Sequence, residues 1–229
     1  MEALRVLRSP IEGMRGVTGQ GSSVPGFIVV ALWAVIGLVS AGVAILLGQG
    51  GGGALEDLPP GTLPEEIGPE ALEGLLVTLQ VVWVFLTAIF PFFYWLVLSL
   101  VMQLVTRFFG GEGSLARMLG AIGAACIPFV VLGLVQLPLT GVQVLLEGGD
   151  PSSAGAGTVI IGLLSFLLYI AALVWHVALV VVGAGVARQI SFGQSGGSCA
   201  ISCAAAIGIP LLLLVLLVAV AALIGGAAG

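Results

Sequence analysis

The chain has 229 residues, of which 59% are hydrophobic and only 7% are charged, and its mean hydropathy is +1.26. Soluble domains carry about 25% charged residues, so this composition excludes a water-soluble globular protein. The net charge of −5 argues against nucleic acid as a partner, and three cysteines, an odd number, do not make a disulfide framework.

Residues 1–24 are expected to form a cytoplasmic leader with a short interfacial helix over 4–17. Ser9 is the candidate N-cap, Pro10 suits the first turn, and Glu12 stands at the capping-box position. The apolar residues that recur at helical spacing are Leu4, Leu7, Ile11 and Met14. The alternative is an ordinary polar lead-in that stops the first span from sliding.

The rest of the chain predicts an all-α, polytopic transmembrane bundle over 25–226, because runs of about 20 apolar residues cross the hydrocarbon core. Five spans are expected, over about 26–47, 71–109, 115–146, 158–188 and 199–225. A Gly- and Pro-rich acidic segment over 49–69 and a short turn over 147–157 connect them on the outer side. On the inner side, a turn over 110–114 has Ser114 as candidate cap, and 191–198 form a loop.

The segment 71–109 would reach about 58 Å as one helix, nearly twice the hydrocarbon thickness. Two spans with a turn at Pro91 would fit by length, but the residues around Pro91 contain no Gly, Asn or charge to build a polar hairpin. Two crossings would also place Arg107 and Arg117 outside. One helix kinked at Pro91 is therefore preferred, with its outer part lying along or protruding from the bilayer.

Positive charge sets the expected orientation, because cytoplasmic loops are rich in Lys and Arg. The six positively charged residues, which are candidate contacts for anionic lipid headgroups, are Arg5, Arg8, Arg15, Arg107, Arg117 and Arg188. Acidic stretches without positive charge alternate with them. The pattern predicts a multi-pass protein of the cell membrane with a cytoplasmic amino terminus and, after five crossings, an extracytoplasmic carboxyl terminus.

Prolines and small residues predict a compact bundle. Pro91, Pro128 and Pro210 each remove a backbone donor that neighbouring groups must replace. Small residues that allow close helix packing are Gly120, Gly123, Ala124 and Ala125 in the third span, and Ala204, Ala205, Ala206 and Gly208 in the fifth. A homo-oligomer is equally compatible with this pattern.

No charged residue lies deep within a span, which argues against ion-coupled transport. The single histidine, His176, stands near mid-bilayer and is expected to be neutral and hydrogen-bonded across the bundle rather than bound to a metal or proton. Its candidate partners, and the candidate intramembrane polar contacts with it, are Gln80, Gln103 and Gln136.

Two further motifs resemble catalytic or metal-binding patterns. Residues 193–196 read G-x-S-G, as in the nucleophile segment of rhomboid-type intramembrane proteases, but Ser195 lies in an expected Gly-rich loop and a chance match is preferred. Cys199 and Cys203 share a helix face, yet two thiols alone do not make a zinc site. We therefore expect no enzyme, no metal and no cofactor.

The arrangement resembles the Yip family, the Ypt/Rab-interacting five-span membrane proteins, in its compact prokaryotic form. The similarity covers most of the chain: an Arg-Ser-Pro leader (8–10), a long second segment ending in FFGGEGS (108–114), GAACIP in the third span (123–128), and Trp175 in the fourth. The eukaryotic amino-terminal domain and the DLYGP signature are missing. The resemblance implies the five-span fold, not Rab binding or vesicle budding.

Two functions follow from these observations. The first is a non-enzymatic membrane protein that organises the bilayer or partner proteins, through its bundle and a basic cytoplasmic face that holds anionic lipid. The alternative is a transporter or channel subunit with a polar path through the proline-broken spans. The partners implied are the lipid bilayer, anionic headgroups, and either a second copy or other membrane proteins.

Overall fold

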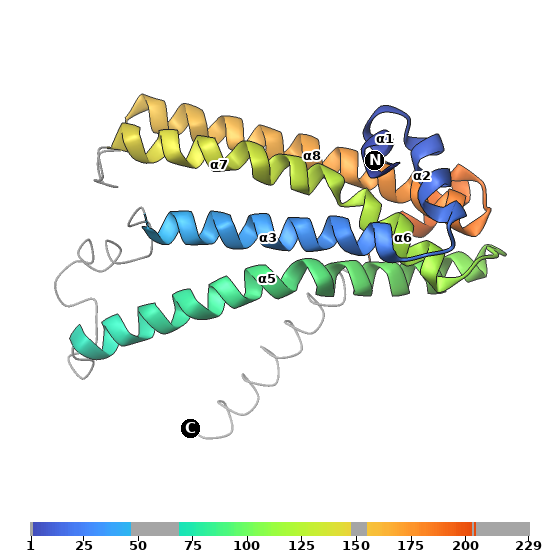
Figure 1. Ribbon diagram of the computed structural model, residues 1–229, viewed down its shortest axis with the longest axis horizontal. Helices are drawn as coiled ribbons and strands as arrows, with labels where there is room; N and C mark the ends of the chain where they lie inside the picture. The colour runs from blue at the N-terminus through green and yellow to red at the C-terminus, as the bar shows by residue number, and fades with distance from the viewer. Residues whose placement is uncertain (1, 47–68, 148–154, 203, 205–229) are drawn as a thin grey trace, which may run out of the picture.

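The computed structural model describes residues 2–46, 69–147, 155–202 and 204 (Figure 1). Within these residues there is no strand, which confirms the all-α helical bundle. The helices are α1 (Glu2–Arg8), α2 (Pro10–Gly19), α3 (Val24–Leu46), α5 (Pro69–Phe108), α6 (Leu115–Ala125), α7 (Ile127–Glu147) and α8 (Ala156–Arg188), followed by helical residues 192–202. Most of the acidic loop 49–69, most of the turn 147–157, Cys203, and most of the fifth span 199–225 lie outside the described residues.

Four described segments are long and apolar enough to cross a membrane: Val24–Leu46, Val77–Phe108, Leu115–Leu146 and Gly157–Arg188. Their outward side chains are large and apolar, with Phe93 62% and Phe166 60% exposed. In lipid such a surface is solvated by acyl chains, so exposure there carries no penalty. The expected fifth crossing remains a prediction.

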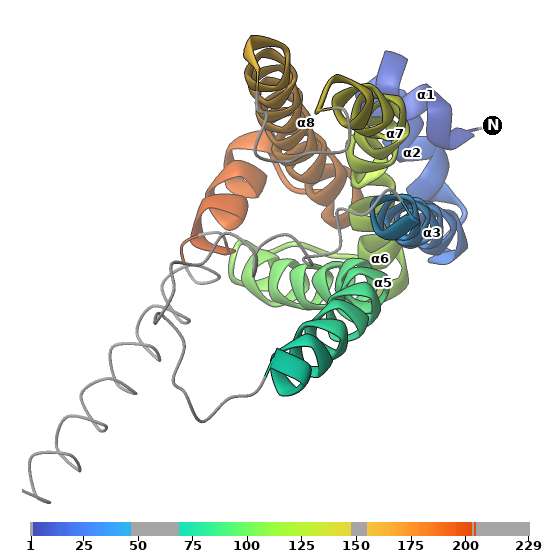
Figure 2. The ribbon, with the colours of Figure 1, turned by 90° about the vertical axis from the view of Figure 1, so that its left-hand side faces the viewer.

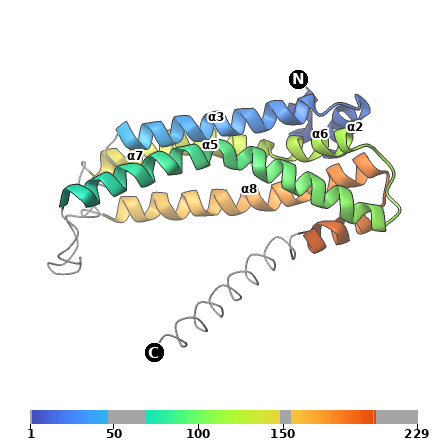
Figure 3. The same ribbon diagram turned by 90° about the horizontal axis from the view of Figure 1, so that it is seen from below.

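The segment that was ambiguous in length is one helix. α5 has 40 residues and runs through Pro91 without a turn, which agrees with the expected single helix rather than a hairpin. At 1.5 Å per residue it is about 60 Å long. Figure 3 shows it bending gently near its middle, as expected where a proline removes one helical hydrogen bond.

The third apolar segment is broken into α6 and α7 at Cys126. Pro128, the second residue of α7, has no N–H to donate to the carbonyl of Ala124. The N–H of Cys126 donates to Gly123 O, three residues back rather than four, at 3.0 Å. The N–H of Phe129 donates to Cys126 O at 3.0 Å. The break therefore releases backbone carbonyls inside the apolar bundle, which need other donors.

α6 lies at the centre of the bundle, between α3, α5, α8 and α2 (Figure 2). Every residue from 120 to 129 is buried. The predicted packing through small residues is confirmed at the crossing of α3 and α6: a methyl group added to Gly26 would lie 2.6 Å from Leu119 O and 2.8 Å from Gly120 O. Glycine at this position lets the two backbones touch.

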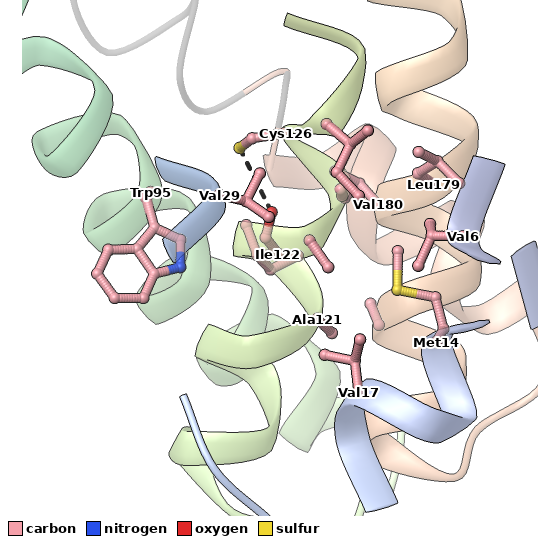
Figure 4. Close-up of a cluster of buried hydrophobic side chains, with 14 of the residues drawn as sticks. Val6, Met14, Val17, Val29, Trp95, Ala121, Ile122, Cys126, Leu179 and Val180 are labelled. Carbon is pink, nitrogen blue, oxygen red and sulfur yellow. Dashed lines mark hydrogen bonds between the residues drawn. The ribbon is translucent and has the colours of Figure 1, made fainter. Parts of the chain in front are cut away.

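The amino-terminal leader differs from the expected single helix over 4–17. It forms α1 and α2, which pack against each other and break at Ser9, and α2 also packs on α6 and α8. Ser9 is the N-cap of α2, but among the described residues its side chain makes no capping hydrogen bond. Met14 and Val17 are fully buried in the core (Figure 4), whereas Ile11 is 39% exposed. The break at Ser9 lets the apolar face of α2 pack against α6 and α8.

Candidate functional site

Charge is segregated between the two ends of the bundle. The arginine-bearing end collects the short helices α1 and α2, the last turns of α5 and α8, and the first turn of α6 (Figures 1 and 3). It carries Arg5, Arg8, Arg15, Arg107, Arg117 and Arg188, with Glu12 and Glu112. The opposite end, where α7 ends at Glu147, has no arginine among the residues that the structure describes. Five helices thus bring together all the positively charged side chains of the chain.

Most of these arginines are accessible. Arg5, Arg8, Arg15 and Arg107 are exposed, and Arg117 is half-buried. The backbone N–H of Arg117 donates to Ser114 Oγ at 3.3 Å, so Ser114 caps α6 as the sequence predicted. Four exposed guanidinium groups and one half-buried one are therefore available to anionic groups at the membrane surface.

Arg188 is an exception to the prediction that all six arginines contact lipid headgroups. It is only 2% exposed, and its guanidinium donates to the carbonyl oxygens of Gly111 and Gly113. Its own carbonyl accepts from the N–H of Glu112 at 3.0 Å. Arg188 therefore joins the end of α8 to the α5–α6 turn, and a burial of this kind could not be read from its place in the sequence.

His176 is on α8, and its side chain lies beside the break between α6 and α7. It is only 1% exposed. Its Nδ1 is 2.8 Å from Ala125 O, and its Nε2 is 2.7 Å from the Tyr94 hydroxyl. A carbonyl only accepts, so Nδ1 must carry the proton; in the neutral ring Nε2 then accepts from Tyr94. The ring also packs on Phe129, with centroids 4.8 Å apart.

This geometry explains why the bundle holds a histidine. Ala125 O is one of the carbonyls released when Phe129 bonds to Cys126 instead, and in hydrocarbon such a group needs a donor. The expected hydrogen bond across the bundle is present, but the predicted glutamine partners were wrong. A proline after an apolar segment, with a lone histidine on the next span, is the signal that would have indicated this pair.

The three glutamines do not converge on His176. Gln136 Nε2 donates to Ser165 O at 3.4 Å and Gln103 Nε2 to Gly113 O at 3.4 Å, near the arginine-bearing end. Gln136 and Tyr94 border a cavity of about 270 Å³ between α3, α5, α7 and α8, whose lining is largely apolar and does not include Gln80 or Gln103.

Ser195 lies in a helix rather than in the expected loop. Residues 192–202 are helical, and Ser191 opens them with a capping box: Ser191 Oγ accepts from the Gln194 N–H at 3.3 Å, and Gln194 Oε1 accepts from the Ser191 N–H at 3.1 Å. Ser195 is fully buried and its hydroxyl donates to Val181 O at 2.6 Å. Ser195 and His176 therefore bond to different partners and not to each other.

The described cysteines are buried within the packing. Cys126 Sγ donates to Ile122 O at 3.4 Å, inside α6, and Cys199 is 4% exposed. In the described part of the chain, no three His, Cys, Asp or Glu side chains are grouped so as to hold a metal ion. The site with accessible chemistry is therefore the arginine-bearing end.

Comparison with known proteins identifies the family but not an activity. A family model described as the Yip1 domain matches residues 4–223, which is nearly the whole chain. No curated protein and no solved structure matches it. With four described helical segments able to span a bilayer, the chain is an integral membrane protein and belongs to the Yip1 domain family.

Proposed function

We propose that this chain is a non-enzymatic, multi-pass protein of the cell membrane that holds anionic lipid at the cytoplasmic face and so organises the bilayer or partner membrane proteins around it. The observation that carries the proposal is the collection of arginines from five helices at one end of the bundle. Cytoplasmic segments are the ones rich in arginine, so this end, and the amino terminus with it, is assigned to the cytoplasm and the carboxyl terminus to the outside.

The exposure of most arginines at this end supports lipid binding rather than a role in holding the fold together. A guanidinium used to hold the fold is buried and bonded, as Arg188 is. Arg5, Arg8 and Arg107 are exposed instead. Each such charge near an anionic surface contributes about 1 kcal/mol of attraction, so several together give a useful affinity.

The alternative, a transporter or channel subunit, has less support. A path through the bundle needs polar groups that line one continuous space. Gln136 borders the cavity of about 270 Å³, whereas Gln103 is buried against the α5–α6 turn near the arginine-bearing end. His176 is saturated by Tyr94 and Ala125. The two glutamine side chains donate to backbone carbonyls at separate places in the bundle, so these groups do not line one continuous path.

The proposal is tested by neutralising the accessible charges together. The full chain and a variant with Arg5, Arg8, Arg15, Arg107 and Arg117 all changed to Gln are reconstituted in nanodiscs of phosphatidylcholine with a minor fraction of phosphatidylglycerol. Lipids that remain bound after detergent extraction are counted by native mass spectrometry. The variant is expected to lose its preference for phosphatidylglycerol. An unchanged preference would refute the role of this end.

A further inference from the structure

The arginine-bearing end is hollowed between three helices. A depression of about 400 Å³ opens between α2, α6 and the end of α8, and its lining includes Arg15 and Arg117. We name it the Arg15–Arg117 hollow. Ligand pockets range from about 300 to 1,000 Å³, so its size suits a small headgroup. Unlike the apolar cavities deeper in the bundle, it combines charged and apolar walls.

Two like charges face this hollow from different helices. Arg15 comes from α2 and Arg117 from α6, and these helices pack directly on each other. Within the part of the chain that the structure describes, neither guanidinium takes part in an ion pair or a hydrogen bond, and the bond from Arg117 to Ser114 is made by the backbone N–H. Two unpaired guanidinium groups at one depression repel each other unless an anion lies between them.

The third wall is built by the end of α8. Gln189 ends that helix in the left-handed conformation, with φ of 56°, and its N–H and that of Ile190 both donate to Gly185 O. The turn lays Phe192 against Gly185, where an added methyl group would lie 3.1 Å from the ring. An apolar ring beside arginines is typical of helices that lie at the membrane interface.

We propose that the Arg15–Arg117 hollow binds a phosphate group, as carried by an anionic phospholipid headgroup or by a soluble phosphate compound. The planar fork of a guanidinium matches two phosphate oxygens, and two forks from different directions enclose the group. The half-exposed ring of Phe192, 49% exposed, would lie against the glycerol and first acyl carbons. This inference rests on the proposed function and narrows it to two of the accessible arginines.

The test compares two pairs of substitutions that remove the same charge. In one variant Arg15 and Arg117 are changed to Gln; in the control Arg8 and Arg107, exposed arginines at the same end that do not line the hollow, are changed to Gln. Each full-length protein is placed in phosphatidylcholine nanodiscs with increasing phosphatidic acid. Bound phosphatidic acid is counted by native mass spectrometry, and helical content and melting temperature confirm that both variants fold.

We expect retention of phosphatidic acid to fall at least about tenfold further for the hollow pair than for the control pair, because the control charges attract any anionic surface and are screened by salt but do not enclose a phosphate group. Equal losses would overturn the hollow while leaving the general lipid role intact. No loss in either pair would refute both. The two failures are thus distinguishable.

Two further arms identify the ligand. Oleic acid, an anionic lipid with a carboxylate head, replaces phosphatidic acid in one; equal retention would overturn the assignment to phosphate. In the other, excess inorganic phosphate competes with phosphatidic acid. Displacement that depends on Arg15 and Arg117 supports the phosphate site and shows that a soluble source suffices, whereas undiminished retention assigns the site to the lipid headgroup.

Discussion

The close contact between α3 and α6 predicts a large effect from one methyl group. In Gly26→Ala the new Cβ would lie 2.6 Å from Leu119 O and 2.8 Å from Gly120 O. Both are backbone atoms, so the overlap is relieved only if the helices separate. Overpacking a core lowers the free energy of unfolding by about 1–3 kcal/mol. Because backbone atoms cannot move aside as a side chain can, we expect a loss in the upper part of this range, about 2–3 kcal/mol. For a protein of this size that corresponds to a fall in melting temperature of roughly 4–12 °C.

The matched control is Gly42→Ala, the same substitution in the same helix. Among the described residues, no heavy atom lies within 4 Å of a Cβ added there, so alanine is expected to leave stability unchanged or raise it by about 0.5–1 kcal/mol. Melting is followed in nanodiscs by a thiol-reactive dye, because Cys126 is fully buried until the bundle opens. Equal melting temperatures for the two variants would refute the central position of α6.

Two other predictions follow from single hydrogen bonds. His176→Phe leaves the buried carbonyl of Ala125 without its donor, and Tyr94→Phe leaves Nε2 of the buried His176 ring without its donor. Each substitution should therefore lower the free energy of unfolding by about 1–3 kcal/mol, and a loss below about 0.5 kcal/mol for either variant in thermal melting would contradict the corresponding hydrogen bond. Ser191→Ala should cost about 0.5–2 kcal/mol by removing a formed cap, measured as faster hydrogen exchange over 192–202. Ser9→Ala should cost less than about 0.5 kcal/mol, and a larger loss there would show that its capping bond does form.

The fold was predictable where one strong physical effect decides the outcome. Long apolar runs without charge indicated the helical bundle, and the lack of any turn former beside Pro91 indicated a continuous helix, as α5 is. Gly120 and Gly123 were expected to bring helices together, and both lie against α3 or the segment that leads into it. These predictions need only local composition and the cost of polar groups in lipid.

The details that depend on three-dimensional partners were not predictable. The capping box was expected at Ser9, where the side chain makes no capping bond among the described residues, and it forms at Ser191 instead. Both positions have the required spacing, so the packing around each helix decides. Arg188 was expected to meet lipid, but the α5–α6 turn presents carbonyls that bind it. The periodicity of apolar residues in a sequence does not reveal which hydrogen-bond donors and acceptors far apart in the chain will meet.

His176 illustrates the same point within the membrane. The sequence predicts a neutral, hydrogen-bonded histidine because it offers no metal-ligating neighbours. The acceptor, however, is the main-chain carbonyl of Ala125, which is free of a helical hydrogen bond only because the helix breaks at Cys126 between α6 and α7. A pattern of side chains in the sequence indicates only side-chain partners such as the glutamines. A released backbone group is found only by following every helical hydrogen bond across the break that a proline causes.

The central claim, that the arginine-bearing end faces the cytoplasm, is tested most directly by labelling. In a variant whose native cysteines are changed to Ala, one new cysteine replaces Glu112 at that end or Gly155 at the other, both exposed positions. A membrane-impermeant maleimide is added to intact cells and then to permeabilised cells. Labelling at position 155 in intact cells, and at position 112 only after permeabilisation, is the expected result; labelling at position 112 in intact cells would contradict the account.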